Sequence, residues 1–293
     1  MTWWVIVNPR SRPIGDLARR VRAALSAAGV DFELLVSASA SHVSELVASG
    51  RAQRASRFAA VGGDGTAHLV LNAMLEEPWA DPPTLAILPA GSGSDFIRTF
   101  GLPRTLEDMA PRLATGDRYR CDVGVLEGGF GRRHVLNVAD AGVAAASVRI
   151  SRRLPRFAGA TRYALGFWLT LPWFPAATIH LVAGGRSYQG PAINVVIANG
   201  QFFGGGMNVA PKAMLVDGEF DVQVFVGPRR NAVAVMPRVV RGLHLTHPAV
   251  RRFSVSDFTL ECPHGWPLEA DGELIGSGPV SGRMLPGAIY FKI

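Results

Sequence analysis

Three glycines, one acid and one threonine make up the sequence GGDGT at residues 62–66, between an apolar run and a helical pattern. Glycine lets the backbone turn sharply after a buried strand and approach a ligand closely. The helix that follows offers unpaired N–H groups to an anion. Asp64 would repel a phosphate unless a divalent cation or its waters lay between them. The pattern predicts a phosphate-binding loop, and a plain strand-to-helix turn capped by Asp64 or Thr66 is the alternative.

Two more polar loops follow apolar runs in the same part of the chain. They read VNPRSR at residues 7–12 and LPAGSGSDFIR at residues 88–98. Up to residue 123, apolar runs alternate with amphipathic helical patterns, which is typical of a parallel sheet covered by helices. Because ligands bind at the carboxyl ends of strands in such sheets, we expect the three loops to converge at one edge. The spacing fits neither the Walker A motif nor the dinucleotide fingerprint.

The architecture changes near residue 123. Residues 1–123 predict an α/β domain with a parallel sheet, onto which the tail 284–293 is expected to pack back. Residues 124–293 are richer in strand-like runs and predict a β-rich sandwich domain. Helical patterns occur there at about residues 144–153, 162–171 and 231–243.

The net charge of +7 is unevenly distributed. Residues 1–123 contain 13 arginines and 13 acids, whereas residues 124–293 contain 17 basic residues and 10 acids. No acid lies between Asp140 and Asp217 or between Asp221 and Asp257. Such basic stretches attract nucleic acid or an anionic membrane, and a merely solvated basic face is the alternative. No recognised nucleic-acid module accompanies these basic stretches.

Residues 163–185 contain no charged side chain and would be long enough to cross a bilayer. Pro172 and Pro175 argue for a helix ending near Leu171 and a strand near Ala177–Ala183 instead. Three nearby aromatic residues suit either a lipid interface or the core: Trp168, Trp173 and Phe174.

The two cysteines, Cys121 and Cys262, suggest neither a disulfide framework nor a four-ligand zinc site. The start of the chain, MTWWVIVNPR, has no basic region before its apolar run, so a cleaved secretory signal is not expected. We therefore expect a cytoplasmic protein.

The loops described above resemble the diacylglycerol kinase catalytic-domain family, which includes bacterial lipid kinases and sphingosine and ceramide kinases. The resemblance continues through NVADAG, NGQFFGGGMNVAPKAMLVDGEFDV and EADGE, and so covers nearly the whole chain. It implies an NAD-kinase-like, Rossmann-like first domain. It also implies ATP-dependent transfer of the γ-phosphoryl group to a lipid hydroxyl, with diacylglycerol as the default acceptor. NAD kinases share a GGDGT loop, but the later motifs look like the lipid-kinase branch.

The resemblance also implies roles for individual residues. Asp64 and Asp95 would hold the catalytic Mg²⁺ directly or through water, and Asp271 would be the general base. A second, structural Mg²⁺ would bind the carboxylate of Asp217, with Met214 and Glu219 offering mainly backbone carbonyls. A turn stabilised by Asp217 and Gly218 is the alternative there. The implied ATP-binding residues are Asn8, Ser37 as a weaker candidate, Gly62, Gly63, Asp64, Gly65, Thr66, Ser92 and Glu273.

Asp271 and Glu273 would face the same way if residues 271–273 were extended, and a tight turn would remove that expectation. Ser94 stands where the family commonly has asparagine, which removes an amide donor and acceptor.

Three functions remain open at this stage. An ATP- and Mg²⁺-dependent lipid kinase, peripherally bound to an anionic membrane surface and without a nucleic-acid partner, is favoured. A kinase for NAD or another small alcohol is the second, and a catalytically silent protein that binds nucleotide and membrane is the third. Neither the lipid acceptor nor the oligomeric state, including a homodimer, follows from the sequence.

Overall fold

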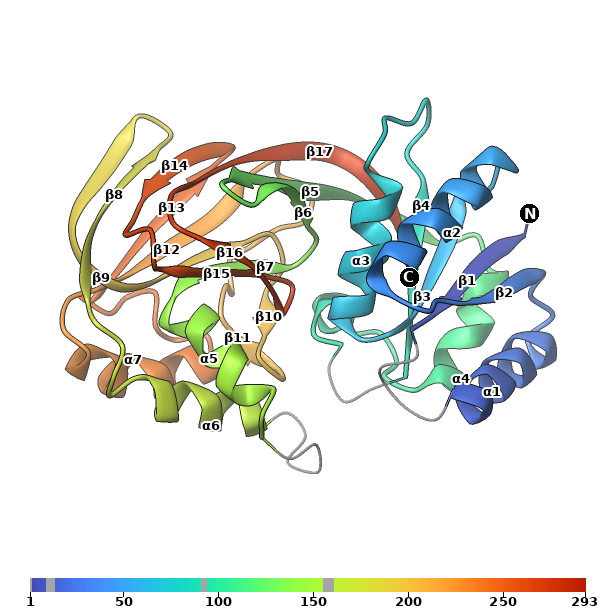
Figure 1. Ribbon diagram of the computed structural model, residues 1–293, viewed down its shortest axis with the longest axis horizontal. Coiled ribbons are helices and arrows are strands. Elements are labelled where there is room, and N and C mark those ends of the chain that lie inside the picture. The colour runs from blue at the N-terminus through green and yellow to red at the C-terminus, as the bar shows by residue number, and fades with distance from the viewer. Residues whose placement is uncertain (1, 9–13, 91–93, 155–160) are drawn as a thin grey trace. The chain divides into compact units, whose positions relative to one another are not determined.

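The computed structural model describes residues 2–8, 14–90, 94–154 and 161–293 of the chain. The chain divides into two compact units, one formed by residues 1–121 with 287–293 and the other by residues 122–286. The sequence analysis placed this boundary after residue 123 and the start of the returning tail at residue 284. The last strand, β17 (Val280–Lys292, red in Figure 1), contributes residues to both units.

The first unit contains a parallel sheet with the strand order β2, β1, β3, β4 and the end of β17. Strands β1, β3 and β4 lie in its interior and are almost wholly buried, which explains their continuous apolar runs. Their carboxyl ends lie at one edge of the sheet, where the polar loops follow. The bounds are β1 Trp3–Val7, β2 Phe32–Val36, β3 Arg57–Gly62 and β4 Thr84–Pro89.

Helices follow the strands of this sheet, as the sequence predicts (Figure 1). α2 begins where the Ser39 hydroxyl accepts a hydrogen bond from the backbone N–H of His42 at 3.1 Å. The helices are α1 Ile14–Ala27, α2 Ala40–Ala52, α3 Asp64–Met74 and α4 Leu106–Met109, with the 3₁₀ helices η2 Phe96–Phe100 and η3 Ala110–Ala114. The predicted α/β class of the first domain is confirmed.

The second unit is rich in antiparallel strands, and its predicted β-rich class is also confirmed. Its longest central strand is β9 (Arg186–Ala198), which pairs with β7, β8 and β12. These strands are β7 Val138–Gly142, β8 Ala177–Ala183 and β12 Phe220–Val226. The others are β5 Arg118–Gly128, β6 Gly131–Val135, β10 Phe202–Phe203, β11 Met207–Asn208, β13 Val250–Val255, β14 Asp257–Glu261, β15 Pro267–Ala270 and β16 Glu273–Ser277.

Among the described residues of this unit, three helices accompany the strands, at α5 Val143–Ser151, α6 Thr161–Thr170 and α7 Arg230–Val240. α6 ends before Pro172, and β8 begins at the predicted residue, Ala177. In the described part of the chain, no helix has both the length and the apolar character needed to span a bilayer.

Two predicted strands are each divided in the structure. The run HVLNVADAG separates into β6 and β7, with Leu136 and Asn137 between them. The run RRFSVSDFTLEC separates into β13 and β14 around Ser256. A hydrophobic pattern marks residues that face a core but does not show where the chain changes its pairing partner, because that depends on strands far away in the sequence.

Two aromatic rings in the core of the second unit lie over glycines. Phe220 and Phe258 form an edge-on pair with ring centroids 5.5 Å apart. A Cβ atom on Gly282 would overlap the Phe258 ring, and one on Gly124 would overlap the Phe220 ring. The strands therefore require glycine at these positions because the rings occupy the space of a side chain.

Gly282→Ala should lower the free energy of unfolding by about 1–3 kcal/mol, because the Phe258 ring must leave its packed position. Urea denaturation of the whole protein measures this change. Gly265→Ala is the matched control, since a Cβ atom there would meet nothing within 4 Å. Equal stability of the two variants would contradict the packing argument.

Candidate active site

The GGDGT loop joins β3 to α3. Gly63 is the N-cap of α3 in an extended conformation, and Asp64 is its first residue. A Cβ atom on Gly62 would overlap the side chain of Thr66, which is buried. Residue 62 must therefore be glycine for the chain to turn from the strand into the helix. The loop places the N-terminus of α3 at the carboxyl edge of the sheet, as the sequence predicts.

Asp64 ties this loop to the second glycine loop. Its Oδ2 accepts a hydrogen bond from the backbone N–H of Asp95 at 2.8 Å, and its Oδ1 accepts one from Phe96 at 3.3 Å. Asp95 is buried, and its Oδ1 lies 3.0 Å from Nε of Arg98. The structure therefore places the Asp64 carboxylate against the backbone of Asp95, while the Asp95 carboxylate pairs with Arg98. Ser92 lies outside the described residues.

The donor set at Asp64 and Asp95 fits a magnesium ion. Carboxylate oxygens are the ligands that Mg²⁺ prefers, and the ion usually keeps several waters and phosphate oxygens as well. No cluster of three or more metal-binding His, Cys, Asp or Glu side chains occurs in the described ranges. A magnesium ion here would therefore take its other ligands from water and nucleotide. Arg98 beside Asp95 offsets part of the negative charge.

The remaining ATP-site candidates in this unit lie at the same sheet edge. Asn8 directly follows β1, and Ser37 directly follows β2. Ser37 is buried, and its hydroxyl donates to the carbonyl oxygen of Val7 at 3.3 Å. In this conformation the Ser37 hydroxyl therefore connects two strands. Ser94 is also buried, and its hydroxyl lies 3.5 Å from the carbonyl oxygen of Gly62.

Asp271 occupies the tight turn between β15 and β16. Its φ of 50° and the φ of 84° at Gly272 place both residues in the left-handed region, and Ala270 pairs with Glu273 across the turn. The extended conformation considered for residues 271–273 is therefore not adopted. Asp271 is buried, and its own N–H donates to Val138 at 2.9 Å.

Backbone N–H groups hold the Asp271 carboxylate in place. Asn137 donates to Oδ1 at 2.8 Å, Leu136 to Oδ2 at 3.0 Å, and Val138 to Oδ1 at 3.3 Å. These bonds fix the orientation of the carboxylate against the segment that leads into β7. The turn conformation and these donors together determine where the predicted base points.

Glu273 is bound by an arginine that the sequence analysis did not single out. Arg152, directly after α5, places Nη2 2.7 Å from Oε2 of Glu273, and the same nitrogen donates to the carbonyl oxygen of Gly272 at 2.9 Å. The end of α5 is therefore tied to the turn that carries Asp271.

The predicted structural magnesium loop closes on itself and on β5. Oδ1 of Asp217 accepts the N–H of Glu219 at 3.1 Å, and the Glu219 carboxylate accepts a hydrogen bond from Ser254. Oδ2 of Asp122 accepts the N–H of Gly218 at 2.7 Å. Burial raises the pKa of Asp217, and the neighbouring charges of Glu219 and Asp122 add to this increase. The described residues include no group of three or more acids, histidines or cysteines that could hold a metal ion, so an ion at Asp217 would take its other ligands from backbone carbonyls and water.

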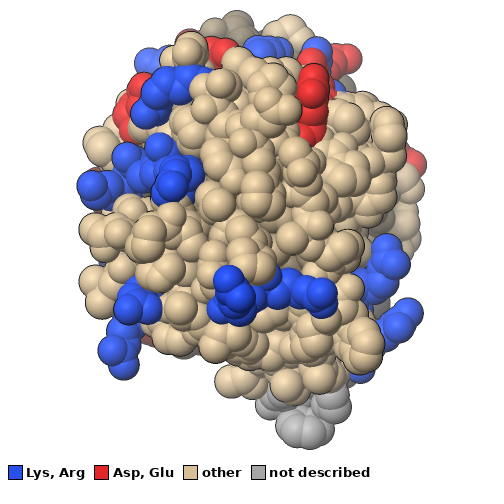
Figure 2. Space-filling view, turned by 90° about the vertical axis from the view of Figure 1, so that its left-hand side faces the viewer, with Lys and Arg blue, Asp and Glu red and all other residues tan. Residues whose placement is uncertain are grey.

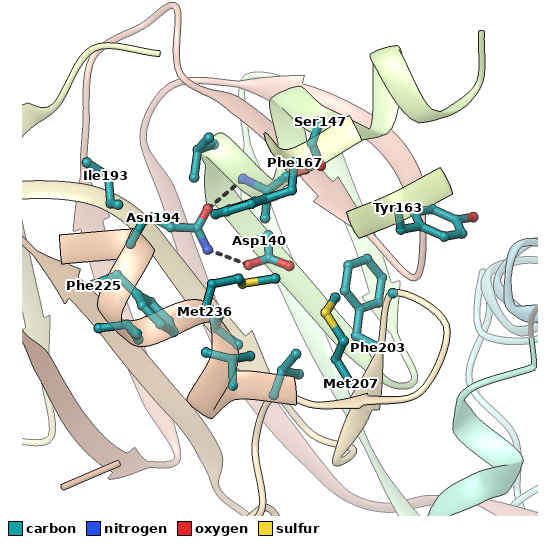
Figure 3. Close-up of a pocket in the computed structure, with 18 of the residues that line it drawn as sticks. Asp140, Ser147, Tyr163, Phe167, Ile193, Asn194, Phe203, Met207, Phe225 and Met236 are labelled. Carbon is teal, nitrogen blue, oxygen red and sulfur yellow. Dashed lines mark hydrogen bonds between the residues drawn. The ribbon is translucent and has the colours of Figure 1, made fainter. Parts of the chain in front are cut away.

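An apolar pocket lies within the second unit, lined by α5, α6, α7 and β9 (Figure 3). Val143, Phe167 and Ile193 are typical of its lining. Its polar lining includes Asp140 and Asn194, which hydrogen bond to one another at 2.7 Å. Asp140 and Asn194 could not be predicted as site residues, because nothing in the local sequence indicates a buried carboxylate that faces an apolar space.

Comparisons with known proteins identify the family of the chain. The diacylglycerol kinase catalytic domain matches residues 2–126, and the YegS C-terminal NAD kinase beta sandwich-like domain matches residues 137–292. The chain belongs to the diacylglycerol kinase catalytic-domain family. It is 24% identical to the lipid kinase YegS of Escherichia coli strain K12 over 244 residues, which cover 79% of this chain and 76% of YegS.

Solved structures from Bacillus anthracis str. Sterne share the fold. A "putative diacylglycerol kinase" aligns with a TM-score of 0.80 and 21% identity over 99% of this chain and 97% of that chain. A second structure, of a diacylglycerol kinase, aligns with a TM-score of 0.73 and 19% identity over 99% and 96%. The family membership makes this chain a lipid kinase by class, which transfers a phosphoryl group to an alcohol. Membership of this kinase family implies that the chain uses ATP.

Asp64→Asn should weaken the binding of ATP with Mg²⁺ by on the order of 10-fold or more, because the amide removes one negative charge and one oxygen acceptor from the joined loops. Calorimetric titration with ATP, in the presence and absence of Mg²⁺, measures the loss. Asp81→Asn changes an exposed acid of the same unit and serves as the control. Unchanged Mg²⁺-dependent binding in the Asp64 variant would rule out its proposed role.

Proposed function

We propose that this protein is an ATP- and Mg²⁺-dependent kinase that phosphorylates diacylglycerol at an anionic membrane surface to give phosphatidic acid. The observation that carries the choice of a lipid acceptor is the apolar pocket of the second unit. NAD or a small alcohol would require several converging polar groups, whereas the side chains lining this pocket are mostly aliphatic and aromatic. Such a lining suits the acyl chains of a lipid.

In this proposal, Asp271 accepts the proton of the lipid hydroxyl. The hydroxyl oxygen forms a bond to the γ-phosphorus of ATP, and the bond between that phosphorus and the β,γ-bridging oxygen breaks to release ADP. Asp64 and Asp95 would hold a magnesium ion, which neutralises the charge on the phosphates when bound. The glycine loop with Thr66, together with Asn8 and Ser37, would surround the nucleotide.

Two further roles belong to the proposal. Glu273 would act near the metal and nucleotide, with Arg152 fixing its side chain. A structural magnesium ion would bind at Asp217, with Met214 and Glu219 contributing mainly backbone carbonyls. The carboxylate of Asp217 supports this second site, because Mg²⁺ prefers hard oxygen donors.

The exposed sides of α6 and α7 combine apolar and basic side chains. Trp173, after α6, is 86% exposed, and Leu243, after α7, is 64% exposed. Leu165 and Leu169 of α6 and Val233 and Val240 of α7 are also exposed. The exposed arginines on and beside α7 are Arg229, Arg230, Arg238 and Arg241.

The charge around these helices is suited to an anionic membrane. Figure 2, which views the second unit from the left-hand side of Figure 1, shows basic side chains across its lower part and also along its left and upper edges, whereas the acidic side chains in view lie mainly toward its upper edge. Tryptophan and leucine insert at the headgroup boundary, and arginine pairs with anionic lipids. Both helices also line the apolar pocket. We infer that this face, the α6–α7 face, binds the membrane from its cytoplasmic side.

Asp271→Asn should reduce the kcat for diacylglycerol phosphorylation by about 10²–10⁴-fold, because the amide cannot accept the hydroxyl proton. Phosphate incorporation from ATP into diacylglycerol in mixed micelles measures it, with NAD as a soluble acceptor for comparison. Asp257→Asn, at an exposed acid of the second unit, is the control.

Three outcomes of this assay would contradict the proposal. Phosphorylation of NAD alone would favour the small-alcohol kinase. Binding of ATP and vesicles without turnover on any acceptor would favour a catalytically silent protein. Full activity of the Asp271 variant would exclude its role as the base.

Trp173→Ser combined with Arg241→Glu should weaken binding to vesicles that contain anionic lipid by on the order of 10-fold, because both apolar insertion and charge attraction are lost. Sedimentation with vesicles at two salt concentrations separates these contributions. Val36→Ser combined with Arg22→Glu makes equivalent changes at exposed positions of the first unit. An equal loss in both double variants would exclude the α6–α7 face as the membrane-binding surface.

A further inference from the structure

Two acids face one another in the interior of the second unit. Asp140 on β7 and Glu269 on β15 are direct partners in the antiparallel pairing of these strands. Side chains of such partners lie on the same face of the sheet, with Cβ atoms about 5 Å apart. Asp140 is 2% exposed and Glu269 is 0% exposed. Two negative charges this close and this deeply buried would be strongly unfavourable.

The hydrogen bonds around the pair indicate that it holds a proton. Oε2 of Glu269 accepts the N–H of Gly272 at 2.7 Å, whereas Oε1 has no hydrogen-bond donor among the described residues. Oδ1 of Asp140 accepts a hydrogen bond from Nδ2 of Asn194 at 2.7 Å. A proton between the two carboxyl groups would supply the missing donor and remove one charge.

The electrostatic surroundings agree with this protonation. Burial raises the pKa of Asp140 to about 6, and burial together with the charge of Asp140 raises the pKa of Glu269 well above its usual range. The charge of Asp271 on the turn adds to the increase at Glu269, and Arg152 after α5 pairs with Glu273 on β16 beyond that turn. Toward the pocket, β9 presents the neutral amide of Asn194, and α6 presents Tyr163.

The pair connects the Asp271 turn to the apolar pocket. Glu269 binds the N–H of Gly272, the second residue of that turn, while Asp140 lines the pocket. Asn194 extends the connection, because its Oδ1 accepts the N–H of Ala144 at 2.9 Å, at the start of α5 (Figure 3). At the other end of the same helix, Arg152 donates to the carbonyl oxygen of Gly272. Both ends of α5 are therefore linked to the turn.

We propose that Asp140 and Glu269 share one proton and that this pair positions Asp271 by holding the Asp271–Gly272 turn in a fixed place relative to the apolar pocket. Neither acid contacts the reacting atoms in this proposal, so both are positioning residues. The inference rests on the proposed role of Asp271 as the base. In this inference, Glu269 keeps the left-handed turn in place, and Asp140 connects the turn to the lining of the pocket.

Glutamine and leucine at position 269 separate the two parts of the proposal. Glu269→Gln keeps an oxygen for the N–H of Gly272 and donates an amide hydrogen to an ionised Asp140, so its kcat should stay within about 3-fold of wild type. Glu269→Leu loses both bonds, and its kcat should fall by about 10–100-fold, while its KM for ATP stays unchanged. Glu261→Gln, at an exposed acid of β14, is the control.

The pH profile provides a readout that a merely structural role would not change. When pH rises through the raised pKa of Glu269, the shared proton is lost and the two buried charges repel one another. The wild-type kcat should therefore fall at alkaline pH, whereas the Glu269→Gln variant should lack this alkaline decrease. Identical profiles for the two proteins would overturn the shared proton.

Two measurements without turnover distinguish a failure of this inference from a failure of the proposed function. The infrared band of a protonated carboxyl group should be present in the wild type and in Glu261→Gln at neutral pH, and lost in Glu269→Gln. Hydrogen exchange of the Gly272 amide should accelerate in Glu269→Leu and not in Glu269→Gln.

If no lipid is phosphorylated by the wild type, the proposed function fails, and these two measurements alone decide the inference. Absence of the carboxyl band from the wild type overturns it, as does slow exchange of Gly272 in both variants. Full kcat in Glu269→Leu, in an active wild-type background, overturns the positioning role.

Discussion

A carboxylate that is buried, like Asp271, or half-buried, like Asp64, needs hydrogen-bond donors, and this protein supplies them from backbone segments far away in the sequence. Asp64 binds the N–H groups of Asp95 and Phe96, and Asp271 binds those of residues 136–138. In each case the carboxylate of a single acid joins its own loop to a second segment through backbone N–H groups. The arrangement of the site therefore depends on bonds between a charged side chain and backbone amides.

Much of the first unit could be predicted from the sequence, because a buried parallel sheet has a simple pattern. Its strands are continuous apolar runs, and its glycine loops follow them directly. The position of Asp64 at the start of α3 follows from the GGDGT pattern. What the sequence did not show is that Asp64 also binds the backbone of the second glycine loop, because that contact spans about thirty residues and depends on the order of the strands.

The second unit was predictable as a class and less so in its details. The alternating runs indicated strands, but the pairing of Asp140 with Glu269 depends on the register of β7 and β15, which are more than a hundred residues apart. Asn194 and Arg152 were missed for the same reason. The turn at Asp271 was one of two conformations that the sequence allowed, and the pairing of Ala270 with Glu273 determined which one forms.

Asp140 and Glu269 of the second unit lie between the apolar pocket and the turn that carries Asp271. A lipid kinase has to bring an apolar substrate to a charged reaction centre, and an ionised group in an apolar pocket is costly. Packing alone does not explain the Asp140–Glu269 pair, since two apolar side chains of similar volume would fill this space at a lower cost. A pair that shares one proton carries one negative charge instead of two, so Asp140 can line the apolar pocket at a lower cost while Glu269 remains a hydrogen-bond acceptor for the turn. The apolar lining and the placement of Asp271 thus depend on the same two strands.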